Sequence, residues 1–235
     1  MVFVEEWAPC GGRGCLIGLQ LPKRSDEAIR LLCLGAHSDD IEIGCGGTLL
    51  LLKEAFPRLK FHWVVFSGGG VRGQEAAKAA ELFTSGSQKQ IVLKDFRDGF
   101  LPYNAAQVKN LFEEMKSEVD PDVIFTQWGG DAHQDHRLLS ELTWNTFRNH
   151  VILEYEVPKY DGDIGRPNFF VPLKAPLYEQ KIDHLFTAFA SQRSKKWFDR
   201  ETFRGLMRLR GMECNSPSGY AEAFHARKVI FQPAD

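Results

Sequence analysis

Two short segments of this chain contain histidine and aspartate at spacings that suit a metal ion. In GAHSDDIEIGCGG, His37 and Asp40 are three residues apart, and in DAHQDHR the same spacing separates His133 from His136. Two imidazoles and one carboxylate would leave a four-coordinate ion one open position. This is the arrangement of a catalytic zinc site, because structural zinc takes four protein ligands. The residue types and their spacing therefore predict a catalytic metal centre.

The glycines of the first segment permit a different interpretation. The letters EIGCGG (42–47) are similar to the turn in which methyltransferases bind S-adenosylmethionine. The strong apolar run IRLLCL ends before His37, however, so these glycines come too late for such a turn and suit the start of a helix. A nucleotide-binding fold also needs an acidic residue near the end of its second strand. The second apolar run ends VVFSGGG without one, so we favour the metal site and keep the methyltransferase as the alternative.

The two segments lie at the ends of predicted strands. Short apolar runs of the kind that fill a parallel sheet occur at 29–36, 61–66, 90–93 and 122–127. Helices are expected between them at Thr48–Phe56, Gln74–Phe83 and Ala105–Val119. This alternation predicts an α/β fold, a Rossmann-like three-layer sandwich with a mostly parallel sheet. Functional groups in such sheets gather beyond the carboxyl ends of the strands, where both segments lie.

After residue 150 the alternation is looser. We expect a strand at 151–158, a loop at 161–172, mostly helix at 174–210 and a last strand at 226–231. The sequence contains no internal repeat or linker, which favours a single domain over residues 1–235. The expected parts of this domain are an N-terminal extension (1–28), a core with the metal site (29–150) and a C-terminal part that completes the pocket (151–235).

The composition excludes several classes of protein. Of 235 residues, 43% are hydrophobic and 26% are charged, as in an ordinary globular protein, and a net charge of −2 provides no field that attracts nucleic acid. No apolar stretch approaches the ~20 residues of a membrane span, and the N-terminus does not read as a signal peptide. The cysteines are odd in number and lack paired spacing, which favours reduced thiols and a cytoplasmic location. They are Cys10, Cys15, Cys33, Cys45 and Cys214.

The chain resembles a known enzyme family in these motifs. A-H-S-D-D-I-E-I-G-C-G-G-T, followed by H-Q-D-H-R, is similar to the signature of the LmbE-like (PIG-L) zinc-dependent de-N-acetylases. VRGQEAAKAAELF resembles the Arg-x-x-Glu helix of that family and FRDGFLP its Asp-Gly turn. One departure is Ser38, where the family usually has proline; this position is not a ligand. The resemblance implies the LmbE-like fold and an enzyme that removes acetyl from N-acetylglucosamine carried on a larger molecule.

The resemblance, read with the chemistry of amide hydrolysis, assigns roles around the metal. It implies that His37, Asp40 and His136 hold one zinc ion, although another divalent metal is an alternative. Zinc polarises a carbonyl as a Lewis acid and lowers the pKa of a bound water toward ~7. Asp39 follows Ser38 and precedes a ligand but should point elsewhere. We expect it to act as the general base on that water and then to pass the proton to the leaving amine.

Four further residues are expected to complete the site. His133 is placed to donate to the developing oxyanion, and we expect its protonated form because an imidazolium is the better donor. Asp135 is expected to hold that imidazole protonated or to orient it; the alternative is a charge at a helix N-terminus. The resemblance implies that Arg72 and Asp98 contact the sugar. The alternatives are a surface ion pair of Arg72 with Glu75 and an aspartate that stabilises its own turn.

The expected partner is a small-molecule amino-sugar conjugate, with no nucleic acid and no stable membrane insertion. Related proteins often assemble, so a homo-oligomer is among the expected states. Besides the methyltransferase, a family member that binds metal without catalysis is a third interpretation of the same motifs.

Overall fold

The computed structural model describes residues 18, 21 and 27–230. Its core is a sheet in the order β3-β2-β1-β4-β5-β7-β6. The strands are β1 (Ile29–His37), β2 (Leu59–Ser67), β3 (Gln88–Leu93), β4 (Val123–Gln127), β5 (Val151–Tyr155), β6 (Phe169–Pro172) and β7 (Ala221–His225). The first five are parallel, and β7 runs antiparallel to both of its neighbours. The predicted mostly parallel α/β sheet is confirmed.

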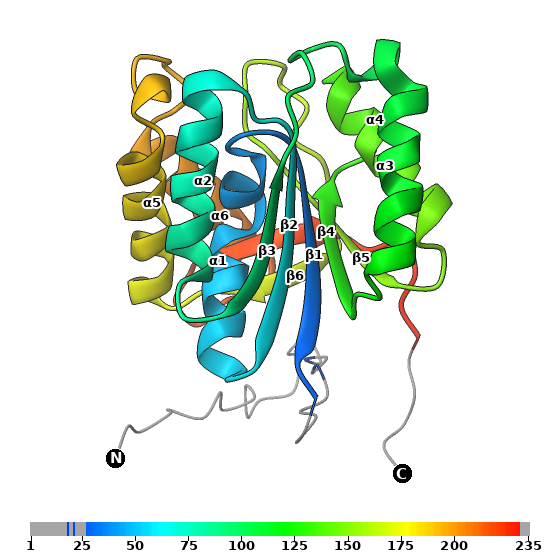
Figure 1. Ribbon diagram of the computed structural model, residues 1–235. Helices are drawn as coiled ribbons and strands as arrows, with labels where there is room; N and C mark the ends of the chain where they lie inside the picture. The colour runs from blue at the N-terminus through cyan, green and yellow to red at the C-terminus, as the bar shows by residue number, and fades with distance from the viewer. Residues whose placement is uncertain (1–17, 19–20, 22–26, 231–235) are drawn as a thin grey trace.

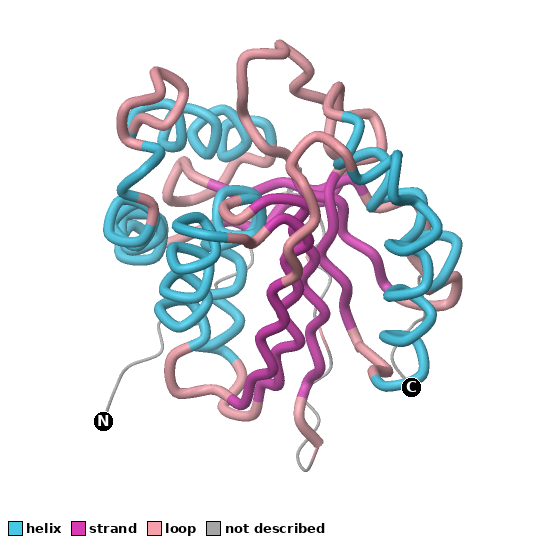
Figure 2. Tube along the Cα trace, turned by 45° about the horizontal axis from the view of Figure 1, so that its top comes forward, coloured by secondary structure: helices cyan, strands magenta, loops and turns pink. Residues whose placement is uncertain are grey.

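Helices cover both faces of this sheet (Figures 1 and 2). One face carries α1 (Asp40–Ala55), α2 (Gly70–Thr84), α5 (Ala175–Ala188) and α6 (Arg200–Glu213); the other carries α3 (Ala105–Glu118) and α4 (Gln134–Thr146). Short 3-10 helices lie at Leu101–Asn104 and Ala190–Gln192. Because side chains alternate along a strand, Leu31 and Cys33 of β1 pack in the first layer of apolar side chains and Leu32 and Leu34 in the second. This is the expected three-layer sandwich.

The order of the strands decides where the two sequence segments meet. β1 pairs in parallel with β4, so the carboxyl ends of these two strands lie side by side, at the top of Figure 1. His37 is the last residue of β1, and α1 begins directly after it at Asp40. DAHQDHR follows β4 and leads into α4. Within the described ranges, none of the helices combines the length and the apolar character that a membrane span requires.

Several predicted elements differ from the observed ones. Helix α1 starts at Asp40 rather than at Thr48, and α4 was not among the predicted helices, although a helix N-terminus at Asp135 was an alternative. Part of the predicted loop at 161–172 is strand β6, which pairs with β7. The last described strand is Ala221–His225, whereas residues 226–230 form no strand. The expected N-terminal extension lies almost entirely outside the described residues, as do Cys10, Cys15 and residue 231.

The glycines of EIGCGG lie inside α1 and make room for neighbouring side chains. A Cβ on Gly44 would overlap the ring of Tyr155, and one on Gly46 would lie 2.6 Å from Phe83. The buried Tyr155 cannot move aside easily, because its hydroxyl donates to the carbonyl of Leu34. The glycines therefore allow close packing of α1 and do not form a cofactor turn after β1, so the feature on which the methyltransferase alternative depended is not formed.

A buried ion pair holds the middle of α1 in place. Glu222 of β7 accepts hydrogen bonds from the backbone N–H groups of Gly47 (2.8 Å) and Thr48 (2.6 Å). Lys181 of α5 lies 2.6 Å from Glu222 Oε1 and 2.6 Å from the carbonyl oxygen of Ile43. Both charged side chains are almost fully buried. A buried ion pair of this kind depends on each partner, because removal of one leaves the other uncompensated.

Gly44→Ala is expected to destabilise the fold, because the added methyl group overlaps a buried ring that is fixed at its hydroxyl end. Overpacking of a core costs about 1–3 kcal/mol, and occasionally more. The matched control is Gly205→Ala in α6, where the added Cβ meets nothing within 4 Å. This second change should stabilise by about 0.8–1 kcal/mol through helix propensity. Urea unfolding of both variants measures the difference; equal free energies of unfolding would contradict the packing role of Gly44.

Candidate metal centre

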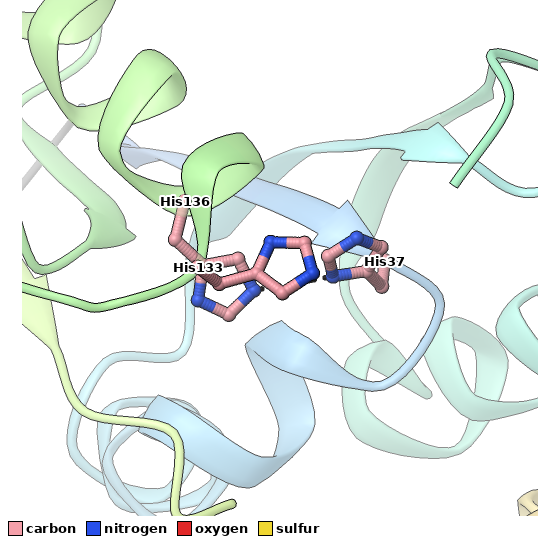
Figure 3. Close-up of side chains that lie close together, drawn as sticks. All are labelled: His37, His133 and His136. Atoms are coloured by element: carbon pink, nitrogen blue, oxygen red, sulfur yellow. Dashed lines mark hydrogen bonds between the residues drawn. The ribbon is translucent and has the colours of Figure 1, made fainter. Parts of the chain in front are cut away.

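Three histidines meet beyond the carboxyl ends of β1 and β4. Figure 3 shows His37, from the end of β1, beside His133 and His136, from the start of α4. His37 and His133 contact edge to face, with ring centroids 4.7 Å apart. Asp40, the first residue of α1, lies buried next to them. The helix start and the strand end thus bring the two motifs, far apart in the sequence, to one point.

The three predicted metal ligands form a compact triangle of ligand atoms. His37 Nδ1 lies 3.1 Å from His136 Nε2 and 3.5 Å from Asp40 Oδ2, and the remaining side, from His136 Nε2 to Asp40 Oδ2, is 3.3 Å. Ligands at about 2.1 Å from a tetrahedral zinc ion are separated by about 3.4 Å, so these atoms match one face of such a tetrahedron. The structure therefore has the ligand geometry for one metal ion.

Hydrogen bonds on the outer nitrogens leave the inner nitrogens free to bind a cation. His136 Nδ1 lies 2.8 Å from Asp131 Oδ2, and His37 Nε2 lies 3.2 Å from Asp135 Oδ2 and 3.1 Å from Asp98 Oδ1. A neutral imidazole has one N–H, which faces the carboxylate in each case, so the opposite nitrogen presents its lone pair. The lone pairs of the two imidazoles and the Asp40 oxygen then face each other. A cation between them would stabilise this arrangement.

The ionisation of these groups shows the same preference for positive charge. Burial lowers the pKa of His136, but the Asp40 and Asp131 carboxylates outweigh burial and raise the pKa to about 9. Burial also opposes the protonation of His37, yet Asp40 and Asp135 raise its pKa well above the usual value. In return, the two imidazoles outweigh the burial of Asp40 and hold its pKa well below the usual range. The centre therefore binds protons tightly without a metal, and a divalent ion would replace them.

Two other groupings of possible ligands occur among the described residues. His133 together with His37 and His136, and Asp98 and Asp135 together with His37, bring their ligand atoms within 4.8 Å of one another. His133 Nδ1 already accepts the backbone N–H of Asp135 at 3.2 Å. The triangle is more deeply buried, because Asp40 is buried whereas His133 is partly exposed and Asp98 is exposed, so we regard it as the better metal site.

Asp39 lies beside the triangle with one oxygen engaged and one free. Its Oδ1 accepts a hydrogen bond from Arg72 Nη2 at 2.8 Å, whereas the buried Oδ2 has no hydrogen-bond partner in the described part of the chain. Burial raises the pKa of Asp39, and the nearby Arg72 opposes this rise. An unpaired buried carboxylate oxygen is costly, so its persistence here suits a group that takes a proton.

Arg72 and Asp98, the two predicted sugar contacts, differ in their surroundings. Arg72 donates to Asp39, the predicted base, and, at 3.3 Å, to Glu75. The ion pair with Glu75 that was the alternative is therefore formed, together with a contact to the base. Glu75 in turn accepts from the backbone N–H of Ser191 (2.7 Å) and from its hydroxyl (2.6 Å). The Asp98 side chain is 78% exposed although it touches His37, so it is open to a ligand.

The side chain of Asp135 contacts His37 rather than the expected His133. It accepts the backbone N–H groups of Gly99 (2.8 Å) and Leu101 (3.1 Å) and so holds the loop after β3 against His37. His133 is the N-cap of α4 and accepts with Nδ1, which leaves its N–H at Nε2. Burial, followed by the neighbouring histidines, lowers the pKa of His133, contrary to the expected protonated form.

The sequence interpretation missed Asp131, which holds both motif histidines. Its Oδ1 accepts the backbone N–H of His133 at 2.7 Å, and its Oδ2 contacts His136 and, at 2.8 Å, Lys159. Burial raises the pKa of Asp131, but His136 and Lys159 outweigh it and lower the pKa to about 2. The available signal was an aspartate at the head of DAHQDH. A second missed residue, Gln127, donates to Asp40 Oδ2 at 3.1 Å.

Comparisons with known proteins agree with the motifs. The family model for GlcNAc-PI de-N-acetylases (PIG-L) matches residues 32–147. The uncharacterized deacetylase YaiS of Escherichia coli is 27% identical over 138 residues, which cover 54% of this chain and 74% of YaiS. N,N'-diacetylchitobiose deacetylase from Pyrococcus horikoshii has a similar structure, with a TM-score of 0.66, 22% identity, and coverage of 85% of this chain and 84% of that one.

The fold is also shared with an enzyme of another class. GalB of Pseudomonas putida, a 4-carboxy-2-hydroxymuconate hydratase, has a TM-score of 0.69 at 16% identity, over 88% of this chain and 99% of its own. Structural similarity at this identity shows the fold, and the reaction has to be argued from the site. The family match spans every predicted site residue, from His37 to His136. By this match over both motifs, the chain contains a PIG-L (LmbE-like) family domain at residues 32–147.

Proposed function

We propose that the protein is a metal-dependent hydrolase that removes the acetyl group from an N-acetylglucosamine-type sugar conjugate. The observation that carries this proposal is the triangle of His37, Asp40 and His136 ligand atoms beside Asp39, whose Oδ2 is buried and free. Amide hydrolysis needs a polarised carbonyl, a base and a donor to the oxyanion. The family and the two deacetylase relatives support acetyl as the group removed.

The residues present fit a divalent ion, for which we propose zinc. His37 Nδ1, Asp40 Oδ2 and His136 Nε2 would hold it, since two imidazoles and a carboxylate form a common catalytic zinc set. When bound, the ion supplies a Lewis acid that polarises a carbonyl oxygen and acidifies water. Asp131 and Asp135 accept the outer N–H groups of the two imidazoles and so orient them.

Asp39 is the proposed general base. Its free Oδ2 would take a proton from the attacking water and later deliver it to the nitrogen of the leaving amine. The Arg72 guanidinium holds Oδ1, which fixes the direction of Oδ2. Burial raises the pKa of this carboxyl, and that makes it a better proton acceptor than an exposed aspartate.

His133 and the residues around it would complete the site. The Nε2–H of His133 is free to donate to the oxyanion, because Nδ1 is occupied by the backbone of Asp135. The exposed carboxylate of Asp98 would accept a hydrogen bond from a hydroxyl group of the sugar. Arg72 would use its remaining N–H groups for the same ring while it holds Asp39. The partner we propose is therefore a small amino-sugar conjugate.

Metal removal tests the proposal. Purified protein is expected to carry about one divalent ion per chain, to lose acetate release on chelation and to regain it with zinc. Because His136 has a pKa of about 9 without metal, the metal must displace a proton below that pH, so zinc affinity should rise as the pH is raised toward 9. Metal analysis, chelator competition and acetate release from N-acetylglucosamine conjugates that differ only in aglycone measure this.

Three outcomes would contradict the proposal in different ways. Full activity in metal-free protein would exclude the metal mechanism. Bound metal without acetate release from any amide would indicate a hydratase-like or non-catalytic member, and GalB shows that this fold carries other chemistry. Binding of S-adenosylmethionine in calorimetry would restore the methyltransferase alternative. His150→Ala is the matched control, since this histidine lies by Asp120, away from the centre, and its loss should change neither metal content nor turnover.

A further inference from the structure

Lys159 contacts Asp131, the hydrogen-bond partner of His136, from a segment that none of the motifs includes. It lies in residues 156–168, which join β5 to β6 and are called here the β5–β6 loop. Its side chain is only 13% exposed. The ammonium lies 2.8 Å from Asp131 Oδ2, 2.6 Å from Asp163 Oδ2 and 3.4 Å from the carbonyl oxygen of Val157. Its three N–H donors thus have three acceptors, two of them charged.

The same oxygen of Asp131 serves both Lys159 and His136. Oδ2 contacts His136 Nδ1 and the ammonium at 2.8 Å each, while Oδ1 accepts the backbone N–H of His133 at 2.7 Å. This carboxylate therefore fixes the imidazole of one histidine, the backbone of the other and the side chain of Lys159. A shift of Asp131 would change the direction of His136 Nε2, which is one corner of the triangle.

The ammonium of Lys159 separates two carboxylates that would otherwise repel each other. Asp131 and Asp163 both point an oxygen at the same ammonium, so its loss would leave two like charges close together in a partly buried place, where they repel. Asp163 is fixed independently, because its Oδ2 accepts the backbone N–H of Ala132 at 2.7 Å. Without Lys159, Asp131 is therefore the carboxylate that we expect to shift.

The β5–β6 loop does not depend on Lys159 for its own position. Glu156, at its start, is held by two hydrogen bonds from Arg210 of α6, at 2.9 and 2.7 Å. Glu156 also accepts the backbone N–H of Gly165 at 3.0 Å, and Arg210 donates to the Gly165 carbonyl. Loss of the Lys159 ammonium should therefore act locally on Asp131 and leave the loop in place.

We propose that Lys159 is a positioning residue of the metal centre, which acts by fixing Asp131 and, through it, His136. The turnover part of this inference rests on the proposed deacetylase function, whereas the metal part does not. Removal of residues that orient a metal ligand typically lowers metal affinity or activity about 10–100-fold. Lys159 acts one contact further out, so we expect the lower end of this range.

Lys159→Met is the main test. We expect zinc affinity by chelator competition to fall about 10-fold, and the turnover number to fall about as much with little change in KM. With Co²⁺ in place of zinc, the visible absorption bands should change in position or intensity, because they report the ligand geometry at the ion. Lys159→Arg should restore most of each property, since a guanidinium also donates to two carboxylates.

Two variants separate this role from a general structural one. Asp163→Asn keeps the contact between Lys159 and Asp131, so metal affinity and spectrum should stay near those of the parent. Lys109→Met removes an ion pair with Glu113 on α3, away from the centre, and should change neither. Parent-like affinity and spectrum in Lys159→Met would overturn the proposal. So would equal losses in Lys159→Met and Asp163→Asn, which would indicate loop anchoring alone.

If Lys159→Met does not fold, Lys159→Gln provides the same test, because it keeps a polar donor and removes the charge. Parent-like metal affinity and Co²⁺ spectrum in that variant would equally overturn the proposal. The affinity and the spectrum need no substrate. An absence of acetate release would therefore count against the proposed function alone, and an unchanged metal centre would count against Lys159 alone.

Discussion

Asp39→Asn is expected to lower deacetylation by about 10²–10⁴-fold, the usual contribution of a general base, while zinc content stays at the parent level. An amide has no basic oxygen that takes a proton from water at neutral pH, so the step assigned to Oδ2 would be lost. The side chain keeps its size, and its amide oxygen still accepts from Arg72, so the fold and the neighbouring ligands should persist. Acetate release and metal analysis on the same sample measure both properties.

Asp40→Asn is the matched comparison, because it makes the same chemical change one residue further along. Asp40 Oδ2 is a corner of the triangle, and a neutral amide oxygen is a weaker ligand than a carboxylate. This variant should therefore bind zinc more weakly and lose activity for that reason. Parent-like zinc binding in both variants would contradict the assignment of Asp40 as a ligand. Loss of zinc from Asp39→Asn alone would indicate that Asp39 is the ligand and Asp40 the base.

The central strands β1, β2 and β4 could be predicted from the sequence because they are buried on both faces. Runs such as FHWVVF have no polar face, which is typical of the interior of a parallel sheet, and the observed β2 contains that run. The meeting of His37 with His133 followed from the rule that functional groups lie beyond the strand ends. That β4 pairs with β1 is a property of the sheet order, which the sequence pattern does not contain.

The start of α1 could not be predicted because the helix is buried on all sides. From Asp40 to Leu50 every residue is buried, so the segment lacks the polar face that marks a surface helix. Its glycines then suggest a turn, since the side chains that need the space, Tyr155 and Phe83, are distant in sequence. Glu222 is a similar case: its charge argues against a buried strand until Lys181 is known to neutralise it.

The partners of the predicted site residues were also beyond reach from spacing alone. Arg72 was expected to face the sugar, and the structure adds a contact to Asp39 that depends on how α2 packs beside α1. Asp135 was expected to serve the histidine next to it in the motif. The turn at the start of α4 instead directs its carboxylate to His37, and only its backbone N–H reaches His133. Sequence motifs name the residues of a site, but helix geometry decides which of them touch.

His136→Ala and His133→Ala are expected to have opposite effects, although the two residues are three positions apart. His136 supplies Nε2 to the triangle, so His136→Ala should lose zinc or bind it much more weakly and lose activity with it. His133→Ala should keep its zinc and near-parent KM, but turn over about 10²–10³-fold more slowly, which is about 3–4 kcal/mol, as expected for one oxyanion donor.

The pH dependence of the parent tests which form of His133 works. Burial and the charges of His37 and His136 lower its pKa below the ordinary 6.5, and a divalent ion that replaces their protons would keep positive charge at the centre. Its imidazole is then neutral at pH 7 and above, and donates through Nε2–H. Raising the pH from 7 to 9 should therefore cause no loss of activity through His133, and any alkaline decline of the parent should persist in His133→Ala.

A decline between pH 7 and 9 that disappears in His133→Ala would show instead that the imidazolium is the working form. Zinc lost from His133→Ala and kept in His136→Ala would exchange the two roles and favour the grouping in which His133 is a ligand. The roles differ because the two rings differ in their contacts. Asp131 holds the outer nitrogen of His136 and leaves Nε2 as a lone pair in the triangle, whereas the backbone of Asp135 occupies Nδ1 of His133 and leaves Nε2 as a donor.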